Sequence, residues 1–138
     1  VLGRGGGALK QMARPFRMFV GGKTGKGRQW LSWIHMDDLT AACSFLLSRE
    51  DLSGAFNLTA PEPVRNRDFA KALGRALHRP AWLPVPGFAL KAALGEFGKT
   101  LIEGQRVVPA RLTASGFSFR FPQLDVALAD LLEKREPR

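Results

Sequence analysis

The chain has 138 residues, of which 45% are apolar and 24% are charged, and its formal net charge at pH 7 is +9. This length suits one compact domain, and no apolar run reaches the roughly 18 to 20 residues that span a bilayer. The single cysteine excludes an internal disulfide framework, and cysteine and histidine spacing suited to zinc is absent. No targeting leader is recognisable. We therefore expect a cytoplasmic protein with neither a metal site nor a membrane partner.

The positive charge is concentrated at the start of the chain. Clustered lysines and arginines gain affinity for phosphates through counterion release, so such a patch can bind nucleic acid or an anionic surface. No recognition helix, zinc finger or aromatic RNA-binding signature accompanies it, so we expect no nucleic-acid partner. An interface with an acidic domain is the other interpretation. The cations that precede the first acidic residue, Asp37, are Arg4, Lys10, Arg14, Arg17, Lys23, Lys26 and Arg28.

The first elements are expected to be short. Residues 1–3 have the pattern of a strand end that runs into a glycine-rich turn. Residues 8–13 can form a helix, which we expect to stop before Pro15 because the residue before a proline disfavours helical geometry. After a polar, glycine-rich connection over residues 21–27, β-branched and aromatic side chains predict a strand over residues 29–34.

Two amphipathic helices are expected to flank a second short strand. Asp37 or Asp38 can cap the first helix, because a carboxylate at a helix start accepts backbone N–H groups and complements the helix dipole. Residues 55–59 predict a strand, and Asn66 is the expected cap of the second helix, which Pro80 ends. The apolar faces consist of Leu39, Ala42, Cys43, Leu46 and Leu47 in the first helix, and Phe69, Leu73, Ala76 and Leu77 in the second.

The last part of the chain reads as mainly helical. Residues 88–94 form an apolar segment after two prolines. Pro109 suits the first turn of a short helix that Gly116 stops. A final helix is indicated by Leu124, Ala127, Leu128, Leu131 and Leu132, which recur at helical spacing.

The most specific local pattern is an aromatic strand end that leads into an acidic helix start, at residues 33–39. His35 and the neighbouring tryptophan either line a substrate cleft or serve the structure, with the aspartates as caps. Ser32, His35 and Asp37 do not form a hydrolase triad, because the segment has no nucleophile elbow and no oxyanion hole. Arg106 and Arg111 are either solvated cations or anion clamps.

Residues 5–7 are all glycine, but they do not form a dinucleotide-binding fingerprint. That motif needs spaced glycines between a strand and a helix, with an acidic residue about 20 positions later. No such residue is present here. The sequence therefore identifies no cofactor-binding residue in this chain.

The order of several motifs resembles the second half of an extended short-chain dehydrogenase/reductase. More narrowly, it is similar to an uncharacterised NAD-dependent epimerase/dehydratase-like family, some of whose members are named as cell-division inhibitors. The motifs that carry the resemblance are residues 1–3, 21–22, 33–38 and 56–64, and then 83–86, 95–96, 104–109, 116–117 and 121–122.

The resemblance implies an α/β fold with few short strands and several helices, the C-terminal, substrate-side portion of an extended Rossmann-type fold. Residues 1–80 would complete the epimerase/dehydratase-like fold, residues 81–133 would form a family-specific helical region, and residues 134–138 would be a frayed tail. The partner would be an N-terminal Rossmann half that carries the glycine fingerprint, the catalytic tyrosine and lysine, and the NAD or NADP contacts. The chain contains no tyrosine. We therefore expect that it binds no cofactor and is not catalytically competent on its own.

The resemblance also implies a substrate-binding role for Arg28, Trp30, Trp33 and His35. Sugar-nucleotide epimerases place a phosphate-gripping arginine where this chain has Leu31, which argues against a sugar-nucleotide substrate unless Arg28 takes that role. The leading hypothesis is that the intact protein is an NAD(P)-dependent epimerase/dehydratase or oxidoreductase with a small-molecule substrate. The alternative is a non-enzymatic regulatory protein that binds a partner through its basic surface. Apolar helix faces that lack their sheet would make the isolated chain self-associate.

Overall fold

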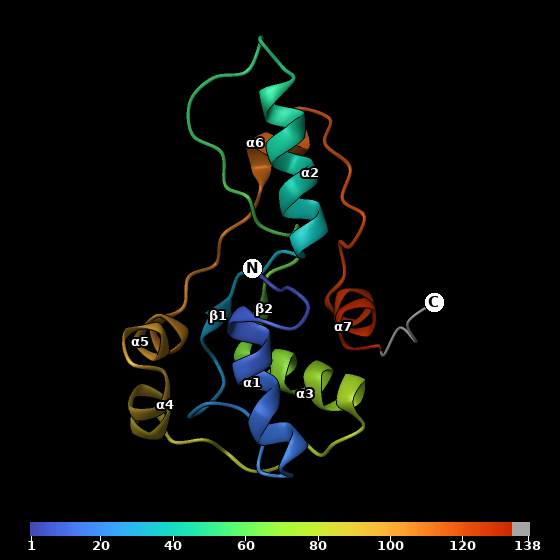
Figure 1. Cartoon of the computed structure of the whole chain (residues 1–138). Coiled ribbons are helices and arrows are strands. Elements are labelled where there is room, and N and C mark those ends of the chain that lie inside the picture. Colours follow the sequence, from blue (N-terminus) through green and yellow to red (C-terminus); the bar gives the residue numbers. More distant parts are fainter. Residues whose placement is uncertain (134–138) are drawn as a thin grey trace.

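The computed structural model describes residues 1–133, and Figure 1 shows that most of its helices gather at one end of the molecule. A two-stranded sheet lies near the middle, and α2 and α6 lie at the other end (Figure 1). The prediction of an α/β chain with few short strands and several helices is confirmed. The elements are α1 (Gly7–Arg17), β1 (Trp30–Leu31), α2 (Met36–Leu47), β2 (Val64–Arg65), α3 (Asn66–Leu77), α4 (Gly87–Leu94), α5 (Glu96–Glu103), α6 (Ala110–Ala114) and α7 (Leu124–Leu132).

The segment that begins with β1 is hydrogen-bonded to the chain on both sides. β1 pairs antiparallel with β2, with Leu31 opposite Val64. Beyond β1, the Trp33 carbonyl accepts a hydrogen bond from Ala60 N at 2.6 Å. Leu2 lies on the other side, where its N–H donates to the Ile34 carbonyl and its carbonyl accepts from Met36 N, at 2.8 and 2.9 Å. The predicted strand over residues 29–34 is therefore extended, but only two of its residues belong to a regular ladder.

The prediction of a strand over residues 55–59 is wrong. This stretch has no ladder partner within the described part of the chain, and a side chain satisfies part of its backbone instead. The Arg111 guanidinium donates to the carbonyls of Ala55, at 2.6 Å, and Ser53, at 2.8 Å. A strand needs a neighbouring backbone, and at Ala55 an arginine side chain binds the carbonyl instead.

α1 does not stop before Pro15, as the sequence predicted, but continues to Arg17. The next residue, Phe16, is 4% exposed and belongs to the core, so its burial offsets the hydrogen bond that proline cannot donate. The Pro15 carbonyl accepts from both Met18 N and Val20 N, at 3.1 and 3.0 Å. This turn satisfies the backbone at the end of the helix.

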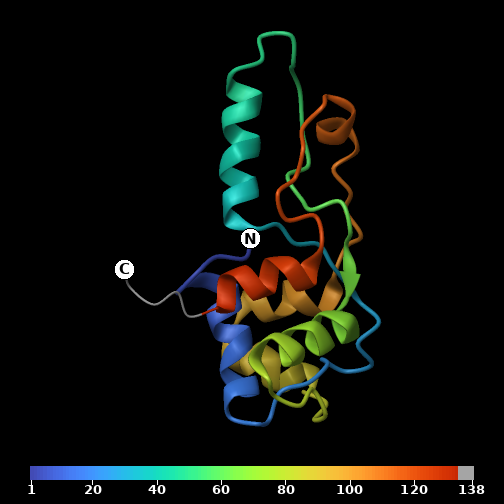
Figure 2. The same ribbon diagram turned by 90° about the vertical axis from the view of Figure 1, so that its right-hand side faces the viewer.

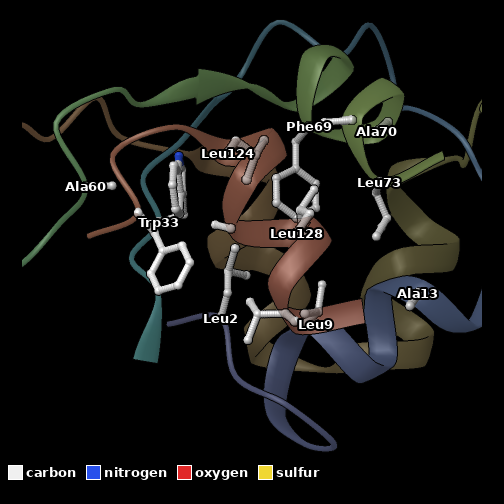
Figure 3. Packing of buried hydrophobic residues seen from close by; sticks show 14 of the residues in the cluster. Leu2, Leu9, Ala13, Trp33, Ala60, Phe69, Ala70, Leu73, Leu124 and Leu128 are labelled. Atoms are coloured by element: carbon white, nitrogen blue, oxygen red, sulfur yellow. The ribbon is translucent and has the colours of Figure 1, made fainter. Parts of the chain in front are cut away.

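The core lies where α1, α3 and α7 meet, and Figure 3 shows its side chains interdigitating. Phe69 and Leu73 of α3 face Leu128 of α7, which confirms the predicted apolar faces of both helices. Trp33 and Leu2 extend this cluster toward the central segment (Figure 3).

The apolar face of α2 is much less buried than the sequence predicted. Ala42 is buried, but Cys43 is exposed and Leu47 is 88% exposed. Figure 2 shows why, because α2 extends away from the helices that form the core, α1, α3 and α7. The prediction of a core-facing stripe is therefore wrong for these two residues, since no element of the described chain covers them.

The short helices of the last part agree with the sequence in two places. α6 follows Pro109, and Gly116, with a φ of 92°, lies just beyond it as expected. α5 was not predicted.

The predicted tail, residues 134–138, lies outside the described residues, and the division of the chain at residue 80 remains a prediction. None of the described helices is long and apolar enough to cross a membrane.

Truncating the centre of the core should destabilise the chain strongly. Leu128 is fully buried between α3 and α1, so Leu128→Ala should lower the free energy of unfolding by about 2 to 5 kcal/mol through lost burial and a residual cavity. Val126, on the same helix, is 49% exposed, so Val126→Ala should change it by no more than about 0.5 kcal/mol. Urea unfolding followed by tryptophan fluorescence measures both. Equal losses would show that α7 does not pack as described.

Candidate functional site

Trp33 is held by the fold rather than presented to solvent. Its side chain is 3% exposed, and its indole Nε1 donates to the Glu62 carbonyl at 2.9 Å. The ring lies among core side chains beside Ala60 (Figure 3). The buried N–H group is therefore satisfied inside the protein.

His35 caps α2. Its Nδ1 accepts a hydrogen bond from Asp37 N at 3.0 Å, which satisfies one of the free N–H groups at the helix start. Because Nδ1 is an acceptor, the ring proton is on Nε2, which donates to Asp130 Oδ2 at 3.2 Å. The ring also stacks on Phe121, with 3.9 Å between the centroids. The prediction that Asp37 or Asp38 caps this helix is therefore wrong, because His35, the residue just before the helix, is the cap.

Asp130 receives two side-chain donors. Besides His35, Arg4 Nη2 donates to Asp130 Oδ2 at 2.9 Å and also bonds the Asp130 carbonyl. Burial by itself raises the pKa of this carboxyl, but the hydrogen bonds from Arg4 and His35 outweigh it and leave the pKa below its usual value. The contact joins residues at the two ends of the chain.

Asp38 is a buried carboxylate with both oxygens occupied. It is 2% exposed, and its two oxygens accept from the backbone N–H groups of Arg120 and Phe121, each at 2.8 Å. Asp37, by contrast, is exposed, and its carboxylate lies 3.8 Å from the Arg120 guanidinium. The two adjacent aspartates thus have different roles, and only the first faces solvent.

A hollow of about 420 Å³ lies between α1, the β1 segment and the end of α5. Ser32 fixes one wall, because its hydroxyl donates to the Gln105 carbonyl at 2.7 Å and accepts from Val107 N at 3.0 Å. Both hydrogen bonds of the Ser32 hydroxyl thus go to residues 105–107. The lining residues are Val1, Leu2, Ala8, Met12, Trp30, Leu31, Ser32, Trp33, Glu103, Gly104, Gln105 and Val107.

Two arginines contact the ring of Trp30 at this hollow. The guanidinium carbon of Arg65 lies 3.8 Å from the ring centroid, and that of Arg106 lies 5.4 Å from it. Arg65 Nη1 also donates to the Arg28 carbonyl at 2.5 Å. In the part of the chain that the structure describes, none of these three arginines forms an ion pair with a carboxylate. Positive charge is thus concentrated around Trp30.

The structure places two of the four predicted site residues in the wall of the hollow, and of the third, Arg28, only the backbone carbonyl is bound near it. Trp30 and Trp33 line the hollow, and Arg28 is tied to the arginine that covers Trp30. His35 does not line it, because its ring points to Asp130 and Phe121. Their part in substrate binding stays a prediction.

The sequence did not single out Met12 or Gln105 as lining residues. The sequence signal next to Gln105 was the glycine at position 104. Gly104 has a φ of 41°, and a Cβ there would collide with the Trp30 carbonyl oxygen. Arg111, considered as an anion clamp, instead uses its guanidinium on the carbonyls of Ser53 and Ala55.

Comparisons with known proteins identify relatives along almost the whole chain. Residues 85–131 match a family described as a domain of unknown function, DUF1731. Epimerase family protein SAR0825 of Staphylococcus aureus is 43% identical over 134 residues, which cover 97% of this chain and 45% of that protein. The chloroplastic SDR39U1 homolog of Arabidopsis thaliana, also named an epimerase family protein, is 47% identical over 133 residues, which cover 96% and 38%.

A solved structure gives the same result. The crystal structure of human epimerase family protein SDR39U1 (isoform 2) with NADPH superposes with a TM-score of 0.89 at 39% identity, and covers 97% of this chain and 46% of that one. Over almost its whole length, the chain is similar to proteins named as epimerase family proteins. It corresponds to the C-terminal part of these relatives and spans less than half of their length. The predicted family is thereby confirmed.

The stability of the chain should be sensitive to loss of one oxygen from the buried Asp38 carboxylate. Asp38→Asn replaces an acceptor by an NH₂ group that faces a backbone N–H, so we expect a loss of about 1 to 3 kcal/mol in the free energy of unfolding. Asp37→Asn alters only an exposed carboxylate near the helix start and should cost less than about 1 kcal/mol. Urea titration of both variants measures this difference. If the two losses are the same, Asp38 does not anchor residues 120–121.

The Asp130 contact should make stability depend on pH at the acid end. Its folded-state pKa is lowered, so its contribution is fully present above the ordinary aspartate pKa of roughly 3.9 and is lost as the pH falls through the lowered value. The difference in free energy of unfolding between the wild-type chain and Asp130→Asn should thus be larger at pH 7 than at pH 3. Asp125→Asn removes only an exposed pair with Arg75 and should have little effect on stability at either pH. A gap between wild type and Asp130→Asn that does not change with pH would contradict the assignment.

Proposed function

We propose that this chain forms the substrate-binding side of an NAD(P)-dependent epimerase/dehydratase or oxidoreductase. The observation that carries the proposal is the hollow of about 420 Å³ beside Trp30 and Trp33. Its volume lies in the range of roughly 300 to 1,000 Å³ that small-molecule sites occupy, and its wall is mostly apolar with a few polar groups. The human relative solved with NADPH supports a nicotinamide cofactor in the intact protein.

The cofactor and the proton-transfer residue would come from the rest of the fold. The chain has no tyrosine and no spaced glycine fingerprint, so its own residues do not fit a dinucleotide site. When bound, the nicotinamide would supply hydride transfer. The contribution of this chain would be to bind and orient the substrate, and to exclude water from it, with Trp30, Trp33 and Met12 as the apolar wall.

The charge around the hollow favours a substrate with an anionic group. Leu31 occupies the position at which sugar-nucleotide epimerases carry a phosphate-gripping arginine. Arg65 and Arg106 lie against the neighbouring Trp30 instead, and Glu103, which also lines the hollow, is paired with Lys99 at 3.8 Å. A guanidinium held on an aromatic ring keeps its edge N–H groups available for a carboxylate or phosphate.

A second candidate function is a regulatory protein without catalysis. The basic loop favours it, because Lys23, Lys26 and Arg28 are exposed and form no ion pair within the described residues. An acidic protein partner would suit this loop. Charge reversal at the three positions should then abolish capture of such a partner in a pull-down, whereas an enzyme would keep its cofactor binding after the same change.

Cofactor binding tests the enzymatic proposal directly. We expect a chimera in which this chain replaces the matched part of human SDR39U1 to bind NADPH, measured by calorimetry. The chain alone should not bind it, because it lacks the dinucleotide site. Human SDR39U1 itself is the matched positive control.

Two outcomes would contradict the proposal. A folded chimera that binds no NADPH would show that this chain is incompatible with the cofactor-bound fold. Equal NADPH affinity of the chain alone and the chimera would place the cofactor site within these 138 residues. Circular dichroism and size-exclusion chromatography of the chimera establish that it is folded.

A further inference from the structure

A second hollow, of about 630 Å³, lies between α1, α3 and the segments around residues 18–24 and 85–89. It shares only Met12 with the first hollow, so the two are adjacent but distinct. Most of its wall is apolar and comes from the inner faces of α1 and α3. The lining residues are Gln11, Met12, Arg14, Pro15, Phe16, Met18, Val20, Gly22, Thr24, Asn66, Phe69, Ala70, Leu73, Val85 and Ala89.

Two polar side chains in this apolar wall have hydrogen-bonding capacity to spare. Thr24 and Asn66 are each 8% exposed, and Asn66 Oδ1 accepts from Thr24 N at 2.7 Å. That bond identifies the oxygen of the amide, so the other end of Asn66 is the NH₂ group. Among the side chains that the structure describes, neither this NH₂ group nor the Thr24 hydroxyl has a protein hydrogen-bond partner.

The prediction that Asn66 caps α3 is accordingly wrong. Asn66 is the first residue of the helix, and its carbonyl oxygen bonds a backbone N–H 42 residues earlier in the chain. Buried polar groups in proteins are nearly always paired. Thr24 and Asn66 are largely buried residues, but their unpaired NH₂ and hydroxyl groups are not among the fully buried atoms and line the hollow, so both can donate to an oxygen acceptor on a ligand.

The charge around this hollow favours an anionic acceptor. Arg14 is one of the lining residues, and Lys10 and Arg17 are exposed on the same helix. No acidic residue occurs before Asp37. The nearest carboxylate along α3 is Asp68, which lies 4.0 Å from the Arg67 guanidinium and is not part of the lining. The resulting positive field attracts a carboxylate more strongly than a neutral oxygen.

The rim of the hollow is apolar and held in place by an unusual turn. Phe19 has a φ of 62°, a left-handed conformation that is rare for a bulky side chain. Trp82 Nε1 donates to the Phe19 carbonyl at 3.1 Å, and the Arg79 guanidinium lies 4.5 Å from the Phe19 ring. The turn places Met18 and Val20, both exposed, at the edge of the hollow.

We propose that this second hollow binds a small molecule with an apolar body and one carboxylate. The apolar body lies against Phe16, Phe69 and Leu73, and a carboxylate oxygen accepts from the Asn66 amide and the Thr24 hydroxyl. The site goes beyond the proposed function and does not rest on it. Because Met12 lines both hollows, an occupant of the second one touches a side chain that forms the wall of the first.

Decanoate is a suitable probe, with 1-decanol as a neutral molecule of the same length. In nitrogen-15 spectra of the full chain, decanoate should shift the side-chain NH₂ signals of Asn66 in a saturable manner. We expect 1-decanol to bind at least about fivefold more weakly, because it lacks the charge that the site favours. Shifts confined to the indole signals of Trp30 and Trp33 would place the ligand in the first hollow and overturn the proposal.

Asn66→Asp is the decisive variant, because it keeps the oxygen that accepts from Thr24 N and removes the NH₂ donor. It should weaken decanoate binding by about tenfold or more. Thr24→Val, which changes no charge, should weaken it by about threefold. Asn57→Asp, the same change at an exposed position, should leave the affinity unchanged.

A third variant fills the hollow without touching its polar groups. Ala70→Leu adds volume to the α3 wall and should reduce binding even if Asn66→Asp proves unstable. Unchanged decanoate affinity in a folded Asn66→Asp or Ala70→Leu chain would overturn the proposal, as would the absence of any saturable shift with the wild-type chain.

Discussion

The fold depends on one segment, residues 30–38, which runs from β1 into the start of α2 and whose backbone and side chains bind five separate parts of the chain. Its backbone pairs with Leu2 on one side and with Ala60 and β2 on the other. Its side chains reach further, since Ser32 holds residues 105–107, His35 holds Asp130 and Asp38 holds residues 120–121. A two-residue ladder is marginal by itself. These hydrogen bonds provide the cross-links that longer strands supply in other folds, and those of Ser32 fix one wall of the first hollow.

The sequence predicted elements well where one helix face meets the core. α3 and α7 were recognisable because their apolar residues recur at helical spacing and pack on each other. The same periodicity in α2 led to a wrong prediction for Leu47, because spacing specifies a face but not the element that covers it. Residues 55–59 show the same limit of local sequence, since strand-forming side chains make a strand only where another backbone is available to pair with. In both places the deciding interaction is tertiary, so the local sequence does not contain it.

The site was less predictable than the fold, and the short polar residues show why. Asp38 and Asn66 both occur at helix starts, where a local cap is the natural interpretation. Each instead accepts backbone N–H groups from a distant part of the chain, 82 or more residues later for Asp38 and 42 residues earlier for Asn66. Local capping competes with such long-range bonds at similar energy, and burial decides between them. His35, which the sequence analysis considered for substrate binding, caps α2 in place of Asp38.

The two hollows differ in how their polar groups are used, and this difference separates their chemistry. In the first, the Ser32 hydroxyl is already bonded on both sides and is not free to bind a ligand. The groups there that can attract an anion are the arginines at Trp30. In the second, the donors of Asn66 and Thr24 lie within the apolar wall itself. A ligand of the first hollow can therefore have its charge beside the arginines at Trp30, whereas a ligand of the second must bring its oxygen to the donors in the apolar wall. Met12, an unbranched and adaptable side chain, is the wall that they share, so a change of its rotamer in one hollow alters the volume of the other.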